Sequence, residues 1–137
     1  MGYYIDQTDS KFVMKKENFG KALQALKEVF IPENMTCIDY VYGKKYPHFS
    51  WVDTNVVLKA KTIEEALKEI RYDPEYDNEG NIVNVEFTFE KFGDEEIFFM
   101  ALAPYIEKGS YISFEGEDGC EWTWFFNGKK VKYLGGD

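Results

Sequence analysis

Apolar and polar residues alternate most regularly near the C-terminus, between Tyr111 and Leu134. The middle of this segment has an apolar face that carries Cys120, Trp122, Trp124 and Phe126. Residues 116–119 and the Asn127-Gly128 pair interrupt the alternation, and the pair is the strongest short signal for a type I′ hairpin turn. Because successive side chains of a strand point to opposite faces, we predict a three-stranded antiparallel meander whose aromatic face anchors the core.

Two further stretches of alternation predict strands outside the meander. At the N-terminus, residues 2–7 and 11–16 flank the polar tripeptide 8–10, and this arrangement predicts a hairpin. Residues 82–91 alternate throughout and predict one long strand. The acidic, proline-containing stretch 71–80 before it is expected to be a loop.

Helical spacing of apolar residues predicts three helices. The first follows Asn18, its expected N-cap, and the second begins with the capping box formed by Thr62 and Glu65. Asp94 is expected to cap the third helix, whose interior, residues 97–103, is apolar nearly all round. A helix with that composition is expected to be largely buried.

These elements predict a single α+β domain over residues 1–137, with the order β-β-α-loop-α-β-α-β-β-β. Strand 82–91 and the meander are expected to form one mainly antiparallel sheet, accompanied by the N-terminal hairpin. About three helices are expected to pack on this sheet. A domain of 137 residues buries about two-thirds of the surface of its unfolded chain, which is enough for one substantial core.

The net charge of −9 is concentrated in one part of the chain. Residues 73–96 contain nine acids and one base, whereas the remaining residues contain sixteen acids and fifteen bases. An acidic face attracts a basic protein surface and repels nucleic acids and anionic membranes. We therefore expect a protein partner with a basic surface, and neither direct nucleic-acid binding nor membrane binding. The candidate partner-binding residues are Asp73, Glu75, Asp77, Glu79, Asp94, Glu95 and Glu96.

The cysteine content and the hydropathy pattern favour a cytoplasmic protein. Cys37 and Cys120 do not make a disulfide framework or a metal site, and Cys120 is expected to be a buried thiol on the aromatic face. No apolar run is long enough to span a membrane, and no secretory leader is expected.

The acidic stretch begins like a calcium-binding loop, because Asp73, Glu75 and Asp77 alternate. The sixth and twelfth positions of that loop require glycine and glutamate, but they are Asn78 and Asn84 here. We therefore exclude an EF-hand and predict no metal ligands.

A second group of acids surrounds the first turn of the meander and comprises Glu115, Glu117, Asp118 and Glu121. A pair of carboxylates can catalyse glycoside hydrolysis, but a catalytic acid needs a pKa raised by burial or by a neighbouring charge. Exposed turn residues lack that burial, so we assign these acids to turn formation and solubility. We predict no catalytic residues and no cofactor-binding residues.

Residues 31–53 are expected to form a long loop with at most a short strand at 49–52. Long loops in compact domains are often functional, and Tyr46, the only histidine His48, and Trp51 are candidates to line a ligand pocket there. The alternative, which we favour, is an irregular flap held down by aromatic side chains. These side chains are Tyr40, Tyr42, Tyr46, Phe49 and Trp51.

The C-terminal half, residues 81–128, resembles small uncharacterised proteins of phages, plasmids and their bacterial hosts. The motifs that carry the resemblance are EKFGDEE at 90–96, PYI at 104–106, GSYI at 109–112, GEDG at 116–119, and Trp122 with Trp124. The resemblance implies a mobile-element setting and assigns no site residues. Small acidic proteins from that setting include anti-CRISPR and other counter-defence inhibitors, which often occupy basic nucleic-acid grooves.

Three functional hypotheses follow. The first is a non-enzymatic, cytoplasmic binding protein whose acidic residues 73–96 meet a basic surface of a nucleic-acid-handling protein. The second is a small-ligand binder or minor enzyme that uses residues 31–53. The third is an immunity-type interaction module.

Overall fold

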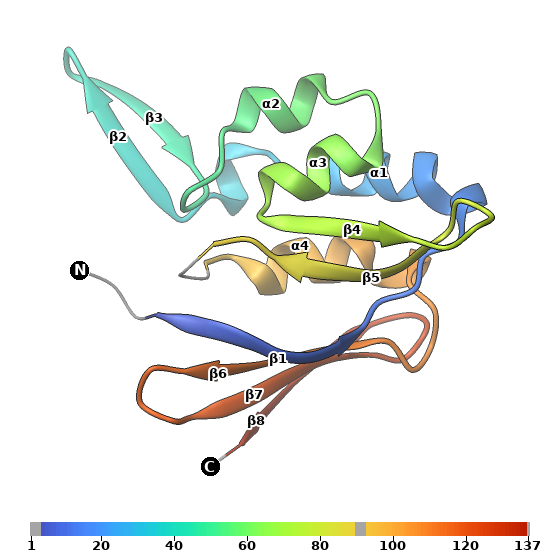
Figure 1. The fold of residues 1–137 in the computed structure, drawn as a ribbon. Coiled ribbons are helices and arrows are strands. Elements are labelled where there is room, and N and C mark those ends of the chain that lie inside the picture. Colours follow the sequence, from blue (N-terminus) through green and yellow to red (C-terminus); the bar gives the residue numbers. More distant parts are fainter. Residues whose placement is uncertain (1–3, 90–92, 137) are drawn as a thin grey trace.

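The computed structural model describes residues 4–89 and 93–136, and it consists of strands and helices in two layers (Figure 1). The strands are β1 Ile5–Lys11, β2 Cys37–Val41, β3 Lys44–His48, β4 Tyr72–Tyr76, β5 Ile82–Phe87, β6 Tyr111–Gly116, β7 Glu121–Phe126 and β8 Val131–Gly136. The helices are α1 Phe19–Glu28, α2 Thr54–Lys59, α3 Ile63–Glu69 and α4 Glu95–Leu102. Short 3₁₀ turns cover Lys16–Asn18, Pro32–Asn34 and Ala103–Tyr105.

The predicted α+β class and the C-terminal meander are both confirmed. Strands β6, β7 and β8 pair antiparallel in sequence order, and β1 completes a four-stranded sheet with the order β1-β6-β7-β8. Trp122, Trp124 and Phe126 are buried, as their common face predicts. The meander therefore supplies the aromatic wall of the core.

The predicted N-terminal hairpin is wrong, because β1 runs unbroken through the polar tripeptide. The register shifts between Gln7 and Asp9, which leaves Thr8 as the extra residue of a β-bulge opposite β6. Further along the chain, Met14 makes an isolated antiparallel bridge to Ile82. A bulge accommodates the same small polar residues that favour a turn, so the local sequence did not distinguish the two.

The stretch predicted as an acidic loop contains strand β4, which pairs antiparallel with β5 in a separate hairpin. The prediction that residues 82–91 join the sheet of the meander is therefore wrong. A register shift opposite Glu75 and Tyr76 leaves Val83 outside the alternation, so Ile82 is buried and Val83 is exposed. Residues 90 and 91 of the predicted strand lie outside the described residues.

Strands β5 and β1 lie side by side, but side chains replace the backbone ladder between them (Figure 1). Gln7 donates from Nε2 to the carbonyl oxygen of Val85 at 2.9 Å and accepts from the Phe87 N–H at 2.6 Å. Ser10 donates to Asn84 Oδ1 at 2.8 Å. We call this junction the seam, because the side-chain amide of Gln7 joins the two sheets as a short stretch of backbone would.

Helix α4 packs against both sheets, and the predicted burial of its apolar interior is confirmed for Phe98, Phe99 and Leu102. The ring of Phe99 contacts Tyr72 of β4 as well as Trp124 and Phe126 of β7. The buried side chains of both sheets and the helices form one core. The number of helices differs slightly from the prediction, because the short α2 was not predicted.

The other two predicted helices are confirmed as α1 and α3. The capping box at α3 is present, with Thr62 accepting from the Glu65 N–H and Glu65 accepting from the Thr62 N–H. Asn18 occupies the N-cap position of α1 but has helical backbone angles, so the cap differs from the usual geometry.

Residues 31–53, predicted as a loop or a packed flap, contain the β2–β3 hairpin, which projects from the body of the molecule (Figure 1). We call Cys37–His48 the arm. The flap prediction is wrong, because Tyr40, Tyr42 and Tyr46 are 65%, 101% and 50% exposed, and Trp51 after the arm is also exposed. Only Phe49 of the predicted set is buried.

Two smaller predictions in the meander are also corrected. The turn after β7 has a positive φ at Gly128 but not at Asn127, so it is not type I′. The side chain of Asn127 instead accepts from the N–H groups of Lys129 and Lys130. Cys120 is exposed rather than buried, because β7 begins only at the next residue, and Cys120 and Cys37 are both thiols.

Candidate functional site

The seven acids predicted as partner contacts fall into two groups. Asp73 and Glu75 lie in β4, and Asp77 and Glu79 follow in the turn before β5. Asp94, Glu95 and Glu96 lie at the start of α4. The two groups have different environments, so the single window seen in the sequence is not a single surface feature.

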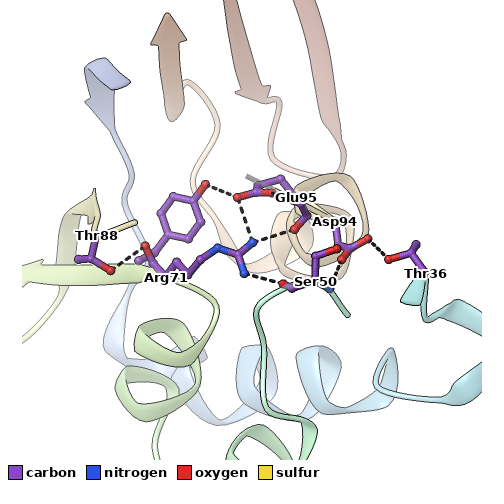
Figure 2. Close-up of polar contacts among 8 residues, drawn as sticks. Thr36, Ser50, Arg71, Thr88, Asp94 and Glu95 are labelled. Carbon is purple, nitrogen blue, oxygen red and sulfur yellow. Dashed lines mark hydrogen bonds and ion pairs between the residues drawn. The ribbon is translucent and has the colours of Figure 1, made fainter. Parts of the chain in front are cut away.

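Glu95 is buried, which corrects its assignment as a surface contact. Its carboxylate lies 3.5 Å from the Arg71 guanidinium and accepts from the Tyr72 hydroxyl at 3.0 Å and the Gly93 N–H at 2.7 Å (Figure 2). Burial raises the pKa of the Glu95 carboxyl to about 7, although Arg71 and the hydrogen bonds oppose that shift. Glu95 is thus part of a buried polar cluster that joins β4 to α4.

Asp94 occupies the predicted N-cap position of α4, but its side chain makes no capping hydrogen bond. Its backbone is left-handed, with φ 68°, and its carboxylate accepts from Thr36 Oγ1 and from the Ser50 N–H, both at 2.8 Å (Figure 2). Arg71 donates to the Ser50 carbonyl, also at 2.8 Å. Thr36 and Ser50 flank the arm, so Asp94 and Arg71 fix its root to the body.

Asp77 holds the turn between β4 and β5. Its carboxylate accepts from the N–H groups of Glu79 and Asn81, each at 2.9 Å, and from the Asn81 side-chain amide. The hydrogen bond from that amide is the main cause of the lowered pKa of Asp77. Within the described ranges, no group of three or more His, Cys, Asp or Glu side chains is placed to hold a metal ion.

Acids from distant parts of the chain gather on the outer face of the strands. Asp73 of β4 pairs directly with Glu86 of β5, and both alternate with the core-facing residues of their strands. On the other side of the seam, Asp6 of β1 pairs with Glu115 of β6, which pairs in turn with Glu121 of β7. We call this row of carboxylates, one from each of five strands, the acidic belt. Its members are Asp73, Glu86, Asp6, Glu115 and Glu121.

An open depression of about 460 Å³ follows the seam and connects the two halves of the belt. Its lining includes Asp6 and Asp9 on the β1 side, with Glu75 and Glu86 on the side of β4 and β5. None of the described lining residues is a lysine or an arginine. The depression is therefore an acidic surface that a positively charged group can enter.

The belt opposes folding rather than assisting it. Like charges directly opposite each other on neighbouring strands destabilise a sheet, and three such pairs occur in this row. The window 73–96 missed Asp6, Glu115 and Glu121, because they lie far from it in the sequence. The alternation of each strand indicated that these acids face outward. Without the strand order, however, it could not show that they lie in one row.

The predicted pocket residues of the long loop do come together. Tyr46, His48 and Trp51 line an open depression of about 580 Å³ at the base of the arm. His48 Nδ1 lies 2.8 Å from the Phe49 carbonyl oxygen, and Nε2 lies 3.4 Å from the Asp39 carboxylate. The contact with the Phe49 carbonyl is the main cause of the raised pKa of His48, and Asp39 adds to it. Both ring nitrogens of His48 therefore contact groups of the protein, and the contact with Asp39 links the two strands of the arm.

Comparisons of the chain with protein-family models, with curated proteins and with solved structures found no match. Within residues 4–89 and 93–136, no helix is both long enough and apolar enough to cross a membrane.

Proposed function

We propose that this protein is a non-enzymatic, cytoplasmic binding protein that engages a basic surface of a protein partner through the acidic belt. The observation that carries the proposal is the set of like-charge pairs on neighbouring strands, Asp73 with Glu86 and Glu115 with both Asp6 and Glu121. Such pairs cost stability, so a basic partner that neutralises them gains binding energy from a feature that folding does not need.

The spacing of the belt favours a partner that handles nucleic acid. Hydrogen-bonded strands lie about 4.8 Å apart, so the paired carboxylates on each side of the seam are spaced roughly 5 Å apart. Each strand of duplex DNA carries one phosphate for about every 3.4 Å of helix axis. A groove built for phosphates can therefore accept the belt, which agrees with a counter-defence, anti-CRISPR-like inhibitor in a phage or mobile-element setting. An immunity-type module would use the same surface for another basic partner.

A second candidate function uses the depression formed by Tyr46, His48 and Trp51. Its aromatic walls suit a small flat ligand, which is the form of the small-ligand hypothesis that the geometry favours. Because both nitrogens of His48 are engaged, binding is better supported there than catalysis.

The main test compares three forms of the protein as bait in a bacterial lysate at low and high salt. The belt variant carries Glu86→Gln, Glu115→Gln and Glu121→Gln, three members of the acidic belt. The control variant carries Glu17→Gln, Glu28→Gln and Glu33→Gln, three exposed acids away from the belt, and changes the net charge by the same amount. We expect a salt-sensitive partner to be captured by the wild-type and control baits and lost with the belt variant. With the purified partner, the loss should appear mainly in the association rate.

Stability provides a second readout for the same variants. Removing like-charge pairs should leave the belt variant as stable as the wild type, or more stable by roughly 0.2–1 kcal/mol. A belt variant that is folded and still captures the same partner at the same rate would exclude the belt as the contact surface.

A further inference from the structure

A separate depression of about 520 Å³ lies between the start of α4 and the β7–β8 hairpin. Its lining is Thr36, Asp94, Glu95, Glu96, Ile97, Trp124 and Tyr133. This volume is within the usual range for binding pockets, which is about 300–1,000 Å³. Unlike the seam, this depression combines acids with aromatic walls.

The aromatic wall is held in place by its surroundings. Tyr133 is 56% exposed, yet its ring meets that of Trp124 at a centroid distance of 5.0 Å. A Cβ atom at Gly135 would lie 3.0 Å from the Tyr133 ring, so glycine at that position leaves room for the ring to pack over the strand. Trp124 itself is buried, so one ring of this wall is fixed by the core and the other packs against it.

The acids make the depression negative. Asp94 is fixed by its hydrogen bonds from Thr36 and Ser50. Glu96, two residues further along the chain in the first turn of α4, is exposed. The N-terminus of a helix contributes about half a positive charge, so two carboxylates outweigh it. Glu95 lies behind them and is already paired with Arg71. The described lining contains no lysine or arginine that could neutralise these acids.

A ligand for this site needs an apolar stem and a positively charged, flat head. An arginine side chain has both, because its methylene groups pack on apolar walls while the guanidinium stacks on aromatic rings and binds carboxylates. We propose that the depression between α4 and β8 receives an arginine side chain of the basic partner. This inference rests on the proposed function for the partner, but the site itself can be tested without it.

In the bound state, the guanidinium lies against Tyr133 and between Asp94 and Glu96, and the methylene stem packs on Ile97 and Trp124. Arginine is favoured over lysine because its planar group can stack on a ring and donate to a carboxylate in the same pose. Asp94 orients the guanidinium more precisely than Glu96 does, because hydrogen bonds from Thr36 and Ser50 fix its carboxylate. Glu96, which is exposed, adds charge.

The test uses small probes and NMR of the full chain. N-acetyl-arginine amide, which imitates an arginine within a protein, should shift the indole N–H signal of Trp124 and the amide signals of Ile97 and Tyr133 with a millimolar dissociation constant. N-acetyl-citrulline amide has the same shape without the charge and should bind at least roughly tenfold more weakly. Equal binding of the two probes would overturn the proposal, because the charge would then not be recognised.

A third probe separates a protein-borne arginine from the free amino acid. Free arginine adds an α-ammonium and an α-carboxylate whose charges offset each other, so a site built for the side chain should bind it no more tightly than the blocked probe. Tighter binding of free arginine would assign the site to a small metabolite and overturn the role in partner binding.

Variants of the lining residues test whether the arginine probe binds in this depression. Glu96→Gln and Tyr133→Leu should each weaken the arginine probe by roughly two- to fivefold, as expected for an exposed ion pair and an exposed cation–π contact. Glu28→Gln, an equal charge change on α1, should leave the affinity unchanged. Equal weakening by all three variants would show general charge attraction and overturn the site.

The two proposals fail separately. If the arginine probe does not bind while the belt variant still loses its partner, the pocket inference falls and the proposed function stands. If the probe binds as described but the belt variant keeps its partner, the pocket stands as a cation site and the belt loses its role.

Discussion

The arm and the four-stranded sheet are both antiparallel and rich in aromatic residues, yet they use those residues in opposite ways. In β7, Trp122, Trp124 and Phe126 alternate with more exposed residues and face one core. In the arm, Tyr40 and Tyr42 are exposed, and so are most residues on both faces of the hairpin. An aromatic side chain thus stabilises the fold only where another layer covers its face.

The comparison also shows how the arm keeps its shape. An isolated two-stranded hairpin is marginally stable at best in water. Here the hairpin is fixed at its root by Asp94 and Arg71, which bind Thr36 and Ser50 on either side of it. Polar contacts at one end therefore replace the core that supports the four-stranded sheet.

The largest expected effect separates a core ring from an arm ring. Phe99→Ala should lower the free energy of unfolding by about 3–5 kcal/mol, because it removes a buried ring that touches both sheets. Tyr42→Ala removes a fully exposed ring and should change the same quantity by less than about 0.5 kcal/mol. Chemical denaturation measures both. Similar losses in the two variants would mean that the arm packs against the body in solution.

The next effect concerns the pH dependence of stability and the buried cluster of Glu95, Arg71 and Tyr72. The Glu95 carboxyl has a pKa of about 7 in the folded protein, against 4.5 for an exposed glutamate. Between these values the folded state holds a proton that the unfolded state has released, so stability should fall as pH rises from 5 to 8. The loss attributable to this group is about 3 kcal/mol.

Glu95→Gln isolates that contribution, because the amide keeps the size of the side chain and does not titrate. The variant should lose less stability than the wild type between pH 5 and 8. His48, whose pKa is also raised, stays in both forms and cancels in the comparison. Asp77 and Glu64 have lowered pKa values, so they act below pH 4.5. Parallel pH profiles for the two forms would refute the assignment to Glu95.

The smallest effect tests the root of the arm. Asp94→Ala removes the acceptor for Thr36 and Ser50 and should cost about 1–2 kcal/mol. The opening should be local, so trypsin should cut after Lys44 or Lys45 roughly five- to thirtyfold faster than in the wild type. Glu96→Ala removes an equal charge two residues away and should leave the cleavage rate nearly unchanged. Unaltered cleavage in Asp94→Ala would mean that Asp94 does not hold the arm.

Local patterns predicted the elements whose environment is simple. The meander, the capping box at Thr62 and the buried helix after Asp94 follow from alternation and capping chemistry, which depend on near neighbours in the sequence. Strand β4 was hidden because Pro74 and its acids resemble a loop, although the strand pairs with β5. The bulge at Thr8 was hidden for a similar reason, since only pairing with β6 distinguishes it from a turn.

The candidate site was harder to predict, because it depends on which strands are neighbours. The sequence indicated an acidic surface and included Asp73 and Glu75 in it, but burial of Glu95 beside Arg71 could not be read from a run of charges. The row formed by Asp6 and Glu115 requires β1 to pair with β6. Long-range pairing of this kind leaves no trace in local periodicity.

The pairing of β1 with β6 also affects the order in which the protein can fold during its synthesis. Lys11 pairs with Tyr111 and Ile5 pairs with Gly116, so β1 is made about a hundred residues before its ladder partner. At 5–20 residues per second, that delay lasts roughly 5–20 s. Val85 and Phe87, which bind Gln7 across the seam, are made sooner. The nascent N-terminal segment can therefore attach first through the seam contacts of Gln7 and Ser10 and the Met14–Ile82 bridge. The four-stranded sheet closes only when nearly the whole chain has been translated.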